Sequence, residues 1–540
     1  MPWSGRPEYH ILRSEVPTQD MPKDPVQNGA WWTLSSAMMM MLVCGTVYAF
    51  GEFSSVFKEE DGYNLSQTKV QLLALAANLG NYFVLDAGVL VSKFGTTAAM
   101  AYGCVLACTG YLLLWWSVAY ESGELPFWCL AFFCFLYGHG CGCVDNGCTT
   151  ELMGDFPDNK GNVIGCLKAY YGLASATIAI VYYAIFSPVK TSFLLFLGIY
   201  SAVMGVLFVP LVHRTRGKVD EPKDIVSRKF RLLTSGLLAF AILFCVVNIL
   251  SQLIDELPGR GRVVWIPVLV LVCVGIVGMF QLARTFPGSP QPLDFHLQGN
   301  RGGVTLVQPV GRGVQNAPRD TSGVGMLCEL DFWLLMLVLT AAQGAGLMFM
   351  NNSGQILPAL QGHAGKGRVT SYVAVISVFN ALGRLAYGNG SEALKGRVSR
   401  PAFLVLSLVI LTSCYTFLFF LGDAMLWPAA VMVGVGYGGL WGVQPVIVSE
   451  LFGPTDFGFK YACSNVAALI GSLCFGTLLA GGQFDRVATD RGESPYCYAP
   501  ECFDVAFGVT AVCGVPALGV CVLLWARTRW VYDRLGAGLQ

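Results

Sequence analysis

About fourteen stretches of this chain are long and apolar enough to cross a lipid bilayer. The bilayer's hydrocarbon core is about 30 Å thick, and about 20 apolar residues span it as an α-helix. The stretches fall into groups of six, two and six: 31–53, 70–92, 98–118, 127–150, 162–186 and 191–212; 231–252 and 263–283; then 331–350, 370–391, 402–421, 427–448, 461–481 and 504–526. This pattern predicts an all-α integral membrane protein.

The composition agrees with this prediction and disfavours several classes of protein. Of the 540 residues, 54% are hydrophobic and 13% are charged, whereas about 25% are charged in a typical soluble domain. The 34 basic and 34 acidic residues balance, so nothing indicates a nucleic-acid partner. Neither a phosphate-binding Gly-x4-Gly-Lys-Ser/Thr loop nor a His-Glu-x-x-His zinc motif occurs. We therefore predict a protein that is not an enzyme and has no cofactor.

Metal binding is also not predicted, although the chain has 19 cysteines. Most of them lie inside apolar stretches, where a thiol behaves as a small hydrophobic group. Cys141 and Cys143 are two positions apart on one predicted helix, which points their thiols about 200° apart. Cys497 and Cys502 lie in the loop before the last span and could pair in an oxidising compartment.

Basic residues beside the spans predict the orientation, because Lys and Arg accumulate in cytoplasmic loops. Basic clusters within 213–231, 395–400 and 527–534 all fall on the same side as the N-terminus. Both termini are therefore predicted to be cytoplasmic. The sequence leaves open whether the membrane is the plasma membrane or an organelle membrane.

A motif that occurs twice divides the chain into two halves. TTELMGDF around Glu151 recurs as IVSELFGP around Glu450, 299 residues later, and the same offset relates Gly45 to Gly344. Many secondary transporters use such repeated halves to build a site at the membrane midplane. Short Gly/Leu matches also arise by chance in apolar sequence, so that alternative stays open. The predicted parts are an N-terminal tail (1–30), a six-helix half (31–213), a basic loop with two extra helices (214–284), a cytoplasmic linker (285–328), a second six-helix half (329–527) and a C-terminal tail (528–540).

Four motifs resemble the nodulin-like family of the major facilitator superfamily. They are DFPDNKGNVIGCLKAYYGLASA (155–176), GTVYAFG (45–51), NALGRLAYG (380–388) and CYAPECF (497–503). The resemblance implies a major facilitator fold, with two six-helix repeats and two extra linking helices. The family is more distantly similar to the monocarboxylate and oxalate/formate transporters, which implies small organic anions as the substrate class.

The loop signature between the second and third helices departs from the superfamily pattern. The superfamily usually has an acidic residue followed by a basic one, whereas GVLVSKFG supplies Ser92 and Lys93. The missing acidic contact could come from Asp86. In the second half, Glu392 stands where an acid would serve. Asp86 and Glu392 are therefore candidate gating residues.

Charged residues inside the membrane are costly and mark functional candidates. Arg384 lies in the span 370–391, and its planar guanidinium matches a carboxylate with two parallel hydrogen bonds. The resemblance to monocarboxylate transporters implies an acid one turn before this arginine, but that position is Asn380. Arg384 could anchor an anionic substrate, or it could make a gating contact between helices.

Lys168 lies about two turns into the span 162–186, beside Tyr171. Its ammonium could bind substrate, pair with a carboxylate or extend toward the membrane surface. Asp145, in the preceding span, is the expected partner, and a carboxylate that loses its ion pair when substrate binds could couple transport to a proton. His139 in the same span could relay protons or simply bond to a neighbour.

Other polar and aromatic side chains in the spans could line a cavity, although each could equally pack or cap a helix. Gln343 and Gln444 are the polar candidates, and Tyr48 and Trp441 could supply aromatic walls. With the residues above, these give the substrate-binding candidates Arg384, Lys168, Tyr48, Tyr171, Gln343, Asn380 and Gln444, and the coupling or gating candidates Asp145, His139, Asp86 and Glu392.

Together these features predict a secondary transporter that carries a small organic anion by alternating access, with a proton as the candidate coupling ion. The expected partners are a small solute and the lipid bilayer, without an obligatory protein partner. Two alternatives stay open. The solute could be an amino acid, haem or a metal chelate, or the chain could be a membrane sensor that does not transport.

Overall fold

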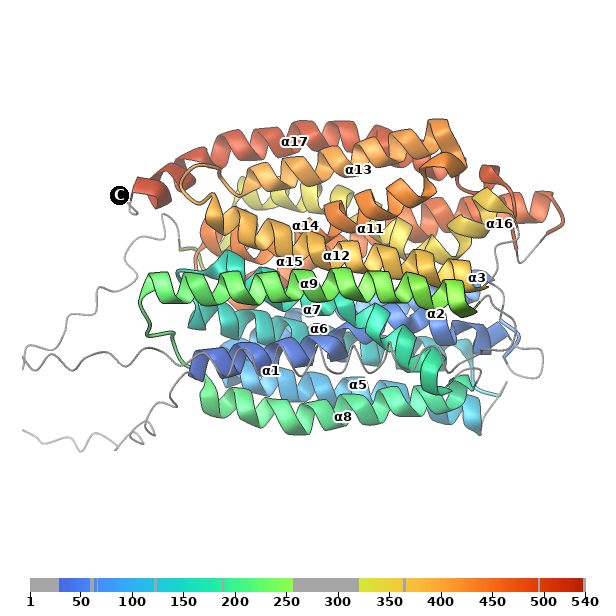
Figure 1. Ribbon diagram of the computed structural model, residues 1–540, viewed down its shortest axis with the longest axis horizontal. Coiled ribbons are helices and arrows are strands. Elements are labelled where there is room, and N and C mark those ends of the chain that lie inside the picture. The colour runs from blue at the N-terminus through green and yellow to red at the C-terminus, as the bar shows by residue number, and fades with distance from the viewer. Residues whose placement is uncertain are drawn as a thin grey trace, which may run out of the picture.

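The computed structural model describes residues 29–58, 63–65, 67–120, 124–186, 189–255, 320–362, 366–493 and 496–537. In this part of the chain the helices run along one common axis and form a bundle (Figure 1). The predicted all-α fold is confirmed. The span predicted at 263–283 and most of the predicted linker lie outside the described residues.

The helices of the first half overlap each of its six predicted spans. They are α1 (Gly29–Cys44), α3 (Gln67–Tyr82), α4 (Leu85–Phe94), α5 (Thr96–Ala119), α6 (Phe127–Asp155), α7 (Lys160–Val181) and α8 (Lys190–Thr215), with the short elements η1 (Gly45–Ala49), α2 (Phe50–Phe53), η2 (Ser54–Lys58) and η3 (Tyr182–Phe186). The span predicted at 70–92 is not continuous. It breaks between α3 and α4, where Val84 has φ −116° and ψ 40°, outside the helical region.

The second half contains the counterparts of the remaining six spans. They are α11 (Leu330–Gln361), α12 (Lys366–Ala393), α13 (Pro401–Leu421), α14 (Leu426–Phe452), α15 (Phe457–Gly471) and α17 (Asp504–Ala537), with the elements η5 (Gly325–Cys328), η6 (Gly422–Met425), η7 (Ser472–Gly481), α16 (Gly482–Asp490) and η8 (Pro500–Cys502). A disulfide joins Cys497 to Cys502. α17 continues past its apolar span, because a helix keeps its backbone hydrogen bonds when it leaves the bilayer.

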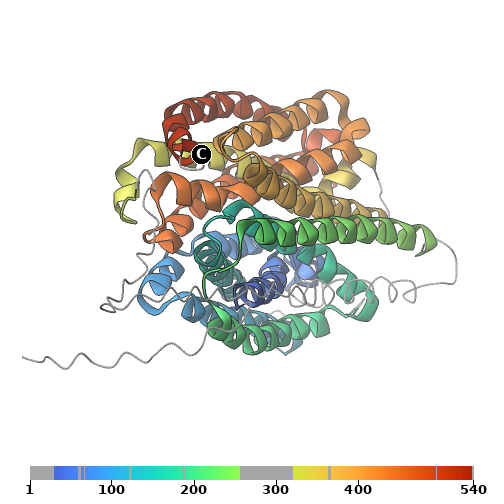
Figure 2. The same ribbon diagram turned by 60° about the vertical axis from the view of Figure 1, so that its left-hand side comes forward.

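The helix α9 (Lys223–Asp255) covers the boundary between the two halves. It packs against α7 of the first half and α12 of the second, and Figure 2 shows it running between them. Thr234 of α9 donates a hydrogen bond of 3.0 Å to Asn389 of α12. This extra helix therefore contacts both of the helices that carry the candidate cations Lys168 and Arg384.

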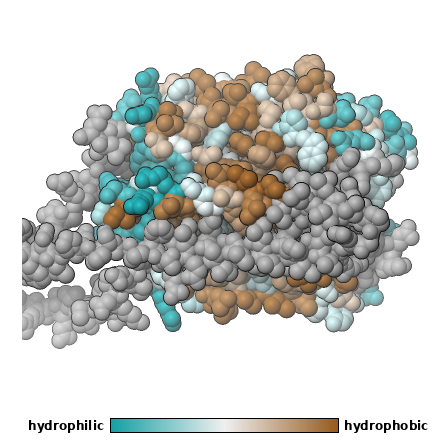
Figure 3. All heavy atoms as spheres, viewed as in Figure 1, coloured by the Kyte–Doolittle hydropathy of each residue, from teal (hydrophilic) through white to brown (hydrophobic). Residues whose placement is uncertain are grey.

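An apolar band fits the predicted membrane location. On the visible face, hydrophobic residues gather across the middle and hydrophilic residues lie toward the two ends (Figure 3). Among the described residues, nine stretches are long and apolar enough to cross a membrane, and one of them, Pro401–Phe452, contains both α13 and α14. α7, α9 and α12 are not among the nine; the α7 residues from 163 to 174 are all buried inside the bundle. Polar residues are tolerated there because they face protein rather than lipid.

The repeated motif occupies the same place in each half. Glu151, near the end of α6, accepts a hydrogen bond from Thr96 at the start of α5. Glu450, near the end of α14, accepts one of 2.9 Å from Arg400, which immediately precedes α13. In both halves the repeated glutamate thus holds the beginning of the preceding helix.

Candidate functional site

A small cavity lies between the two halves. Nine residues line it: Tyr48, Asn81, Tyr82, Asp145, Lys168, Tyr171, Arg384, Trp441 and Asn465. The free space between their side chains is about 10 Å³, close to the minimum that one water molecule needs. The cavity is therefore nearly filled by its own side chains, and a solute can enter only if the halves separate.

Lys168 is held in this cavity by two partners from different halves. Its Nζ lies 2.5 Å from Asp145 Oδ1 on α6 and donates a hydrogen bond of 2.9 Å to the Tyr461 hydroxyl on α15. Tyr461 in turn donates to the second Asp145 oxygen at 3.1 Å. Only 1% of Lys168 is exposed, so the ammonium lies between helices and not at the membrane surface. Its partner is the aspartate that the sequence indicated.

Arg384 lies in the same cavity and donates one hydrogen bond to another side chain. Its Nε donates a hydrogen bond of 2.7 Å to Asn380 Oδ1, one turn earlier on α12. The guanidinium carbon lies 5.0 Å from the centre of the Tyr171 ring and 6.0 Å from that of Trp441, which is within the range of cation–π attraction. Its Nη2 is buried without a hydrogen-bond partner. Among the described residues, Arg384 forms no ion pair with a carboxylate.

Aromatic rings from both halves enclose these two cations. The Tyr48 and Tyr171 rings are 5.4 Å apart, and Tyr82 stacks on Trp441 at 5.8 Å. The hydroxyl of Tyr48 lies 3.4 Å from that of Tyr437 on α14. Rings in this arrangement give the cavity rigid walls with polar tips. Tyr48 and Tyr171 therefore lie in the wall of the cavity, and their contact with substrate stays a prediction.

The two predicted glutamines do not line the cavity. Gln343 Nε2 donates to Gln444 Oε1 at 2.6 Å, and Gln444 Nε2 donates to Asn465 Oδ1 at 3.1 Å. Both glutamines are fully buried. They form a hydrogen-bonded chain that ends at Asn465, which lines the cavity, and their contact with substrate stays a prediction.

Sequence reasoning missed four residues of the site: Asn81, Tyr82, Tyr461 and Asn465. Tyr461 and Asn465 are four residues apart on α15, so they share one face of that helix. Asn81 donates a hydrogen bond of 3.3 Å to the Tyr171 hydroxyl. Polarity within an apolar span was the available signal for both asparagines, but it does not reveal which way a side chain points.

The helices α7 and α12 approach so closely that their backbones touch. A Cβ atom added at Gly388 would lie 2.5 Å from Gly165 Cα, closer than any side chain allows. Small residues let membrane helices pack at such short range. Beside Arg384, the contact between the two halves is therefore made by the backbones of Gly165 and Gly388.

Further contacts join the halves on either side of the cavity. At one end, Lys160 of α7 donates to Ser449 of α14 at 2.7 Å, and the Gly161 N–H donates to Glu392 at 2.8 Å. At the other end, Thr68 of α3 donates to Asp485 of α16. Separation of the halves at either end requires one of these sets to break.

Glu392, a predicted gating residue, belongs to the first of these contact sets and not to the cavity. It lies 2.7 Å from Arg400 and 3.1 Å from Lys395. Burial alone would raise the pKa of Glu392, but the positive charges of Arg400 and Lys395 outweigh it and hold this pKa below its usual range. Glu392 is therefore an ionised acceptor for the Gly161 backbone of the other half.

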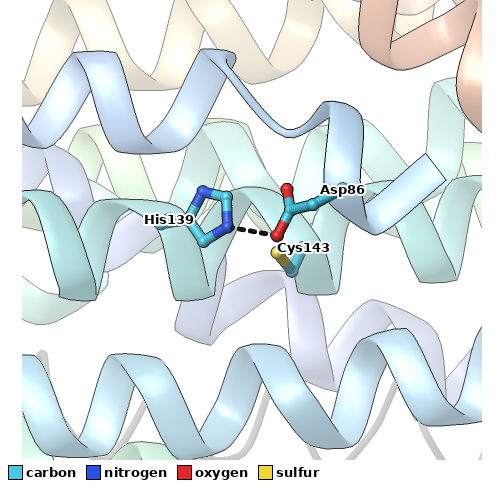
Figure 4. A group of neighbouring side chains, drawn as sticks. All are labelled: Asp86, His139 and Cys143. Atoms are coloured by element: carbon cyan, nitrogen blue, oxygen red, sulfur yellow. Dashed lines mark hydrogen bonds and ion pairs between the residues drawn. The ribbon is translucent and has the colours of Figure 1, made fainter. Parts of the chain in front are cut away.

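His139 and Asp86 also lie outside the cavity, where they pair with each other. His139 Nε2 is 2.9 Å from Asp86 Oδ2, and the Cys143 thiol lies beside them (Figure 4). The three donor atoms lie within 4.8 Å of one another, and nitrogen, oxygen and sulfur together suit a borderline divalent cation. This group is the part of the described structure best able to hold a metal, and it combines residues that the sequence did not bring together.

The sequence of the whole chain is similar to known family models and proteins. Residues 30–277 match the Nodulin-like family model, and residues 320–534 match the model of the NFD4 C-terminal domain. The chain is 22% identical to Protein NUCLEAR FUSION DEFECTIVE 4 of Arabidopsis thaliana, covering 94% of this chain and 90% of that protein. It is also 22% identical to the probable transporter MCH1 of Candida albicans, over 81% and 82% of the two chains.

Solved structures share the fold. The proton:xylose symporter XylE aligns with a TM-score of 0.57 at 12% identity, covering 92% of this chain and 95% of that one. A peptide transporter of the POT family aligns with a TM-score of 0.51 at 13% identity, over 93% and 96%. The matching models, the relatives and the two structures agree with the two-half bundle described above. The chain is a multi-pass membrane protein that carries a Nodulin-like domain at residues 30–277 and shares the fold of transporters of the major facilitator superfamily.

Proposed function

We propose that this protein is a secondary transporter that carries a small organic anion by alternating access, with Arg384 as the residue that anchors the anion. Transport of a solute across a membrane is supported by the transporters among its relatives and by its fold. The proposal that the solute is an anion depends on the charges of the central cavity.

The observation that carries the proposal is the unpaired guanidinium of Arg384. Lys168 and Asp145 neutralise each other at 2.5 Å, whereas Arg384 adds a positive charge that contacts an amide oxygen and aromatic rings and, among the described residues, no carboxylate. Buried charges are normally paired. A carboxylate that entered beside Arg384 would supply the missing partner and would satisfy the free Nη2.

Lys168 provides a second contact point for an anion. A substrate carboxylate that approached its ammonium would compete with Asp145 and with the Tyr461 hydroxyl. Since Tyr461 belongs to the other half, this exchange of partners would loosen a contact between the halves. Binding and the rearrangement of the two halves are thereby linked through one ammonium group.

The small cavity favours a small solute over a large one. Aromatic rings and two cations surround the free space, and a haem or chelate-sized ligand would need all of these walls to move. An amino acid is the competing substrate, because its carboxylate could use Arg384 while its ammonium used Asp145. Both termini are proposed to lie in the cytoplasm, as the basic clusters predict.

The test is uptake of radiolabelled monocarboxylates, dicarboxylates and amino acids into proteoliposomes that contain the purified protein. Wild type is compared with Arg384→Gln and Lys168→Gln, and Arg397→Gln serves as the control because it removes an exposed arginine at one end of the bundle. We expect saturable uptake of one acid, abolished by the first two changes and kept by the third. The assignment fails if well-folded wild type carries no acid, or if Arg384→Gln transports as wild type does.

A further inference from the structure

His139 connects the two sides of the break between α3 and α4. Its Nδ1 lies 3.2 Å from the backbone oxygen of Gly80, in the last turn of α3. Its Nε2 lies 2.9 Å from Asp86 Oδ2, in the first turn of α4. The imidazole of α6 therefore contacts both sides of the break, and Figure 4 shows its ring directed at the Asp86 carboxyl.

Cys143 adds a sulfur atom to this contact. It follows His139 by four residues on α6, so the two side chains share one face of that helix, and Figure 4 shows the thiol beside the Asp86 carboxyl. Cys143 is fully buried and forms a small apolar cluster with Val84 at the break and Ala462 of α15. Its thiol forms no hydrogen bond among the described residues. One nitrogen, one oxygen and one sulfur atom thus meet at the break.

The spacing of the three donor atoms suits a single metal ion. They lie within 4.8 Å of one another. A zinc-type ion binds nitrogen and oxygen at about 2.0–2.2 Å and thiolate sulfur at about 2.3 Å, so its ligand atoms are roughly 3.3–3.6 Å apart. Nε2 and Oδ2 are already closer than this, at 2.9 Å, and a small rotation of the Cys143 side chain would bring the sulfur into range.

The surroundings of His139 orient its ring for a metal. Because the Gly80 carbonyl oxygen can only accept, a hydrogen bond to it uses a hydrogen on Nδ1, and Nε2 then presents its lone pair toward the carboxyl and the thiol. Metal-bound histidines are commonly held in this way by a backbone carbonyl behind the ring. Phe135 stacks on the imidazole at 5.3 Å, and only 7% of His139 is exposed. The ring is therefore fixed before any metal binds.

Charge and access also fit a divalent ion. A thiolate and a carboxylate supply two negative charges, which balance a doubly charged ion, and a neutral imidazole adds none. A group without net charge is the less costly form inside a membrane. Half of the Asp86 side chain is exposed, so the group is open on one side, where a metal can enter and a fourth ligand can bind.

We propose that Asp86, His139 and Cys143 bind a divalent transition-metal ion of the zinc type, which fastens the break between α3 and α4 to α6. Mixed nitrogen, oxygen and sulfur ligands select such an ion over Mg²⁺ and Ca²⁺, which prefer oxygen alone. The site lies outside the substrate cavity and does not depend on which solute the protein carries. From the sequence no metal was predicted, because Cys143 was considered together with Cys141, whose thiol instead donates to the Val43 oxygen.

Cobalt(II) is the probe in the first experiment, because it replaces zinc and absorbs light when a thiolate binds it. The full-length protein, purified in detergent and freed of metal with a chelator, is titrated with Co²⁺. We expect one equivalent to produce a thiolate-to-cobalt absorption band, and one equivalent of Zn²⁺ to remove it. Cys143→Ser should abolish the band, whereas Cys141→Ser, a change at a buried cysteine of the same helix, should keep it. No band in the wild type, or a band that survives Cys143→Ser, overturns the proposal.

A second variant keeps the test decisive if Cys143→Ser does not fold. Asp86 is half exposed, so Asp86→Asn should leave the fold intact while it removes a charged ligand. We expect this variant to bind Co²⁺ about tenfold more weakly or worse, and we expect Zn²⁺ to raise the melting temperature of the wild type but not that of Asp86→Asn. The control is Asp423→Asn, which changes an exposed aspartate between α13 and α14. Equal Co²⁺ affinity for the two aspartate variants would contradict the site.

Discussion

Two arginines of this protein are almost completely buried, at 1% and 2% exposure, yet their surroundings differ sharply. Arg400 contacts three acceptors: Glu450 at 2.9 Å, Glu392 at 2.7 Å and Ser391 at 2.5 Å. Arg384 contacts one amide oxygen and leaves Nη2 without a partner. The comparison separates an arginine that holds the protein together from one whose partner must come from outside.

The partners of a buried cation indicate whether it has a structural role. Taking a guanidinium out of water costs several kcal/mol unless carboxylates and hydrogen bonds offset the loss. At Arg400 two glutamates offset it within the chain. At Arg384 aromatic rings and Asn380 do so only in part, so the cavity keeps a positive charge that an anion would neutralise. Four substitutions test this contrast.

The largest effect on stability is expected from Arg400→Gln. The change leaves Glu392 and Glu450 buried without their main cation, and breaking a buried pair in this way costs about 3–5 kcal/mol. Thermal unfolding in detergent measures the loss. Lys395→Gln is the matched control, because it removes only one partly exposed contact of 3.1 Å to Glu392. Equal melting temperatures for the two variants would contradict a structural role for Arg400.

Arg384→Gln should do the opposite, weakening substrate binding without lowering stability. Hydrogen bonds to charged groups contribute about 1.5–3 kcal/mol each, so the loss of a bidentate contact should lower affinity about a hundredfold. Substrate protection against thermal unfolding measures this affinity. If the variant unfolds as readily as Arg400→Gln does, Arg384 has a structural role and the two arginines do not differ as proposed.

Asn380→Asp should make Arg384 resemble Arg400. The new carboxylate would stand where Asn380 Oδ1 now accepts from Nε at 2.7 Å, and it would compete with substrate for the guanidinium. We expect affinity to fall about tenfold, by about 1.4 kcal/mol. The same binding assay applies, with Asn389→Asp on the same helix as the control. Unchanged affinity would show that the free charge of Arg384 does not attract the substrate.

The smallest effect is expected from Tyr461→Phe, which removes one hydroxyl between Lys168 and Asp145. A single hydrogen bond contributes about 1 kcal/mol, so affinity should change no more than about fivefold. Because Tyr461 joins the halves, the rate of transport should change more than the affinity. Comparing the maximum rate and KM of uptake checks this, and a change confined to KM would count against the proposed link.

The sequence could identify the cations of the site, because a charge inside an apolar span stands out in a single residue. It could not identify Tyr461, which reaches Lys168 from 293 positions further along the chain. Gln343 and Gln444 were predicted to line a cavity or to pack, and the rotation of a helix decides whether such a side chain faces the cavity or a neighbour. Here Gln343 donates to Gln444, and Gln444 donates to Ser464 and Asn465.

Within the described residues, the predicted spans coincide with helices along most of their length, but the break between α3 and α4 was not predicted. Neither Gly nor Pro occurs at Phe83 or Val84, so the sequence gives no warning that α3 ends and α4 begins there. Without the break, His139 and Asp86 could be assigned only separately. Their contact of 2.9 Å depends on geometry that no local pattern encodes.

The tightness of the central cavity bears on the motion that transport needs. With only about 10 Å³ left between the lining side chains, a solute of several heavy atoms displaces those side chains wherever it binds among them. Binding and opening of the site are then one event, and a longer solute should need a wider opening between the halves.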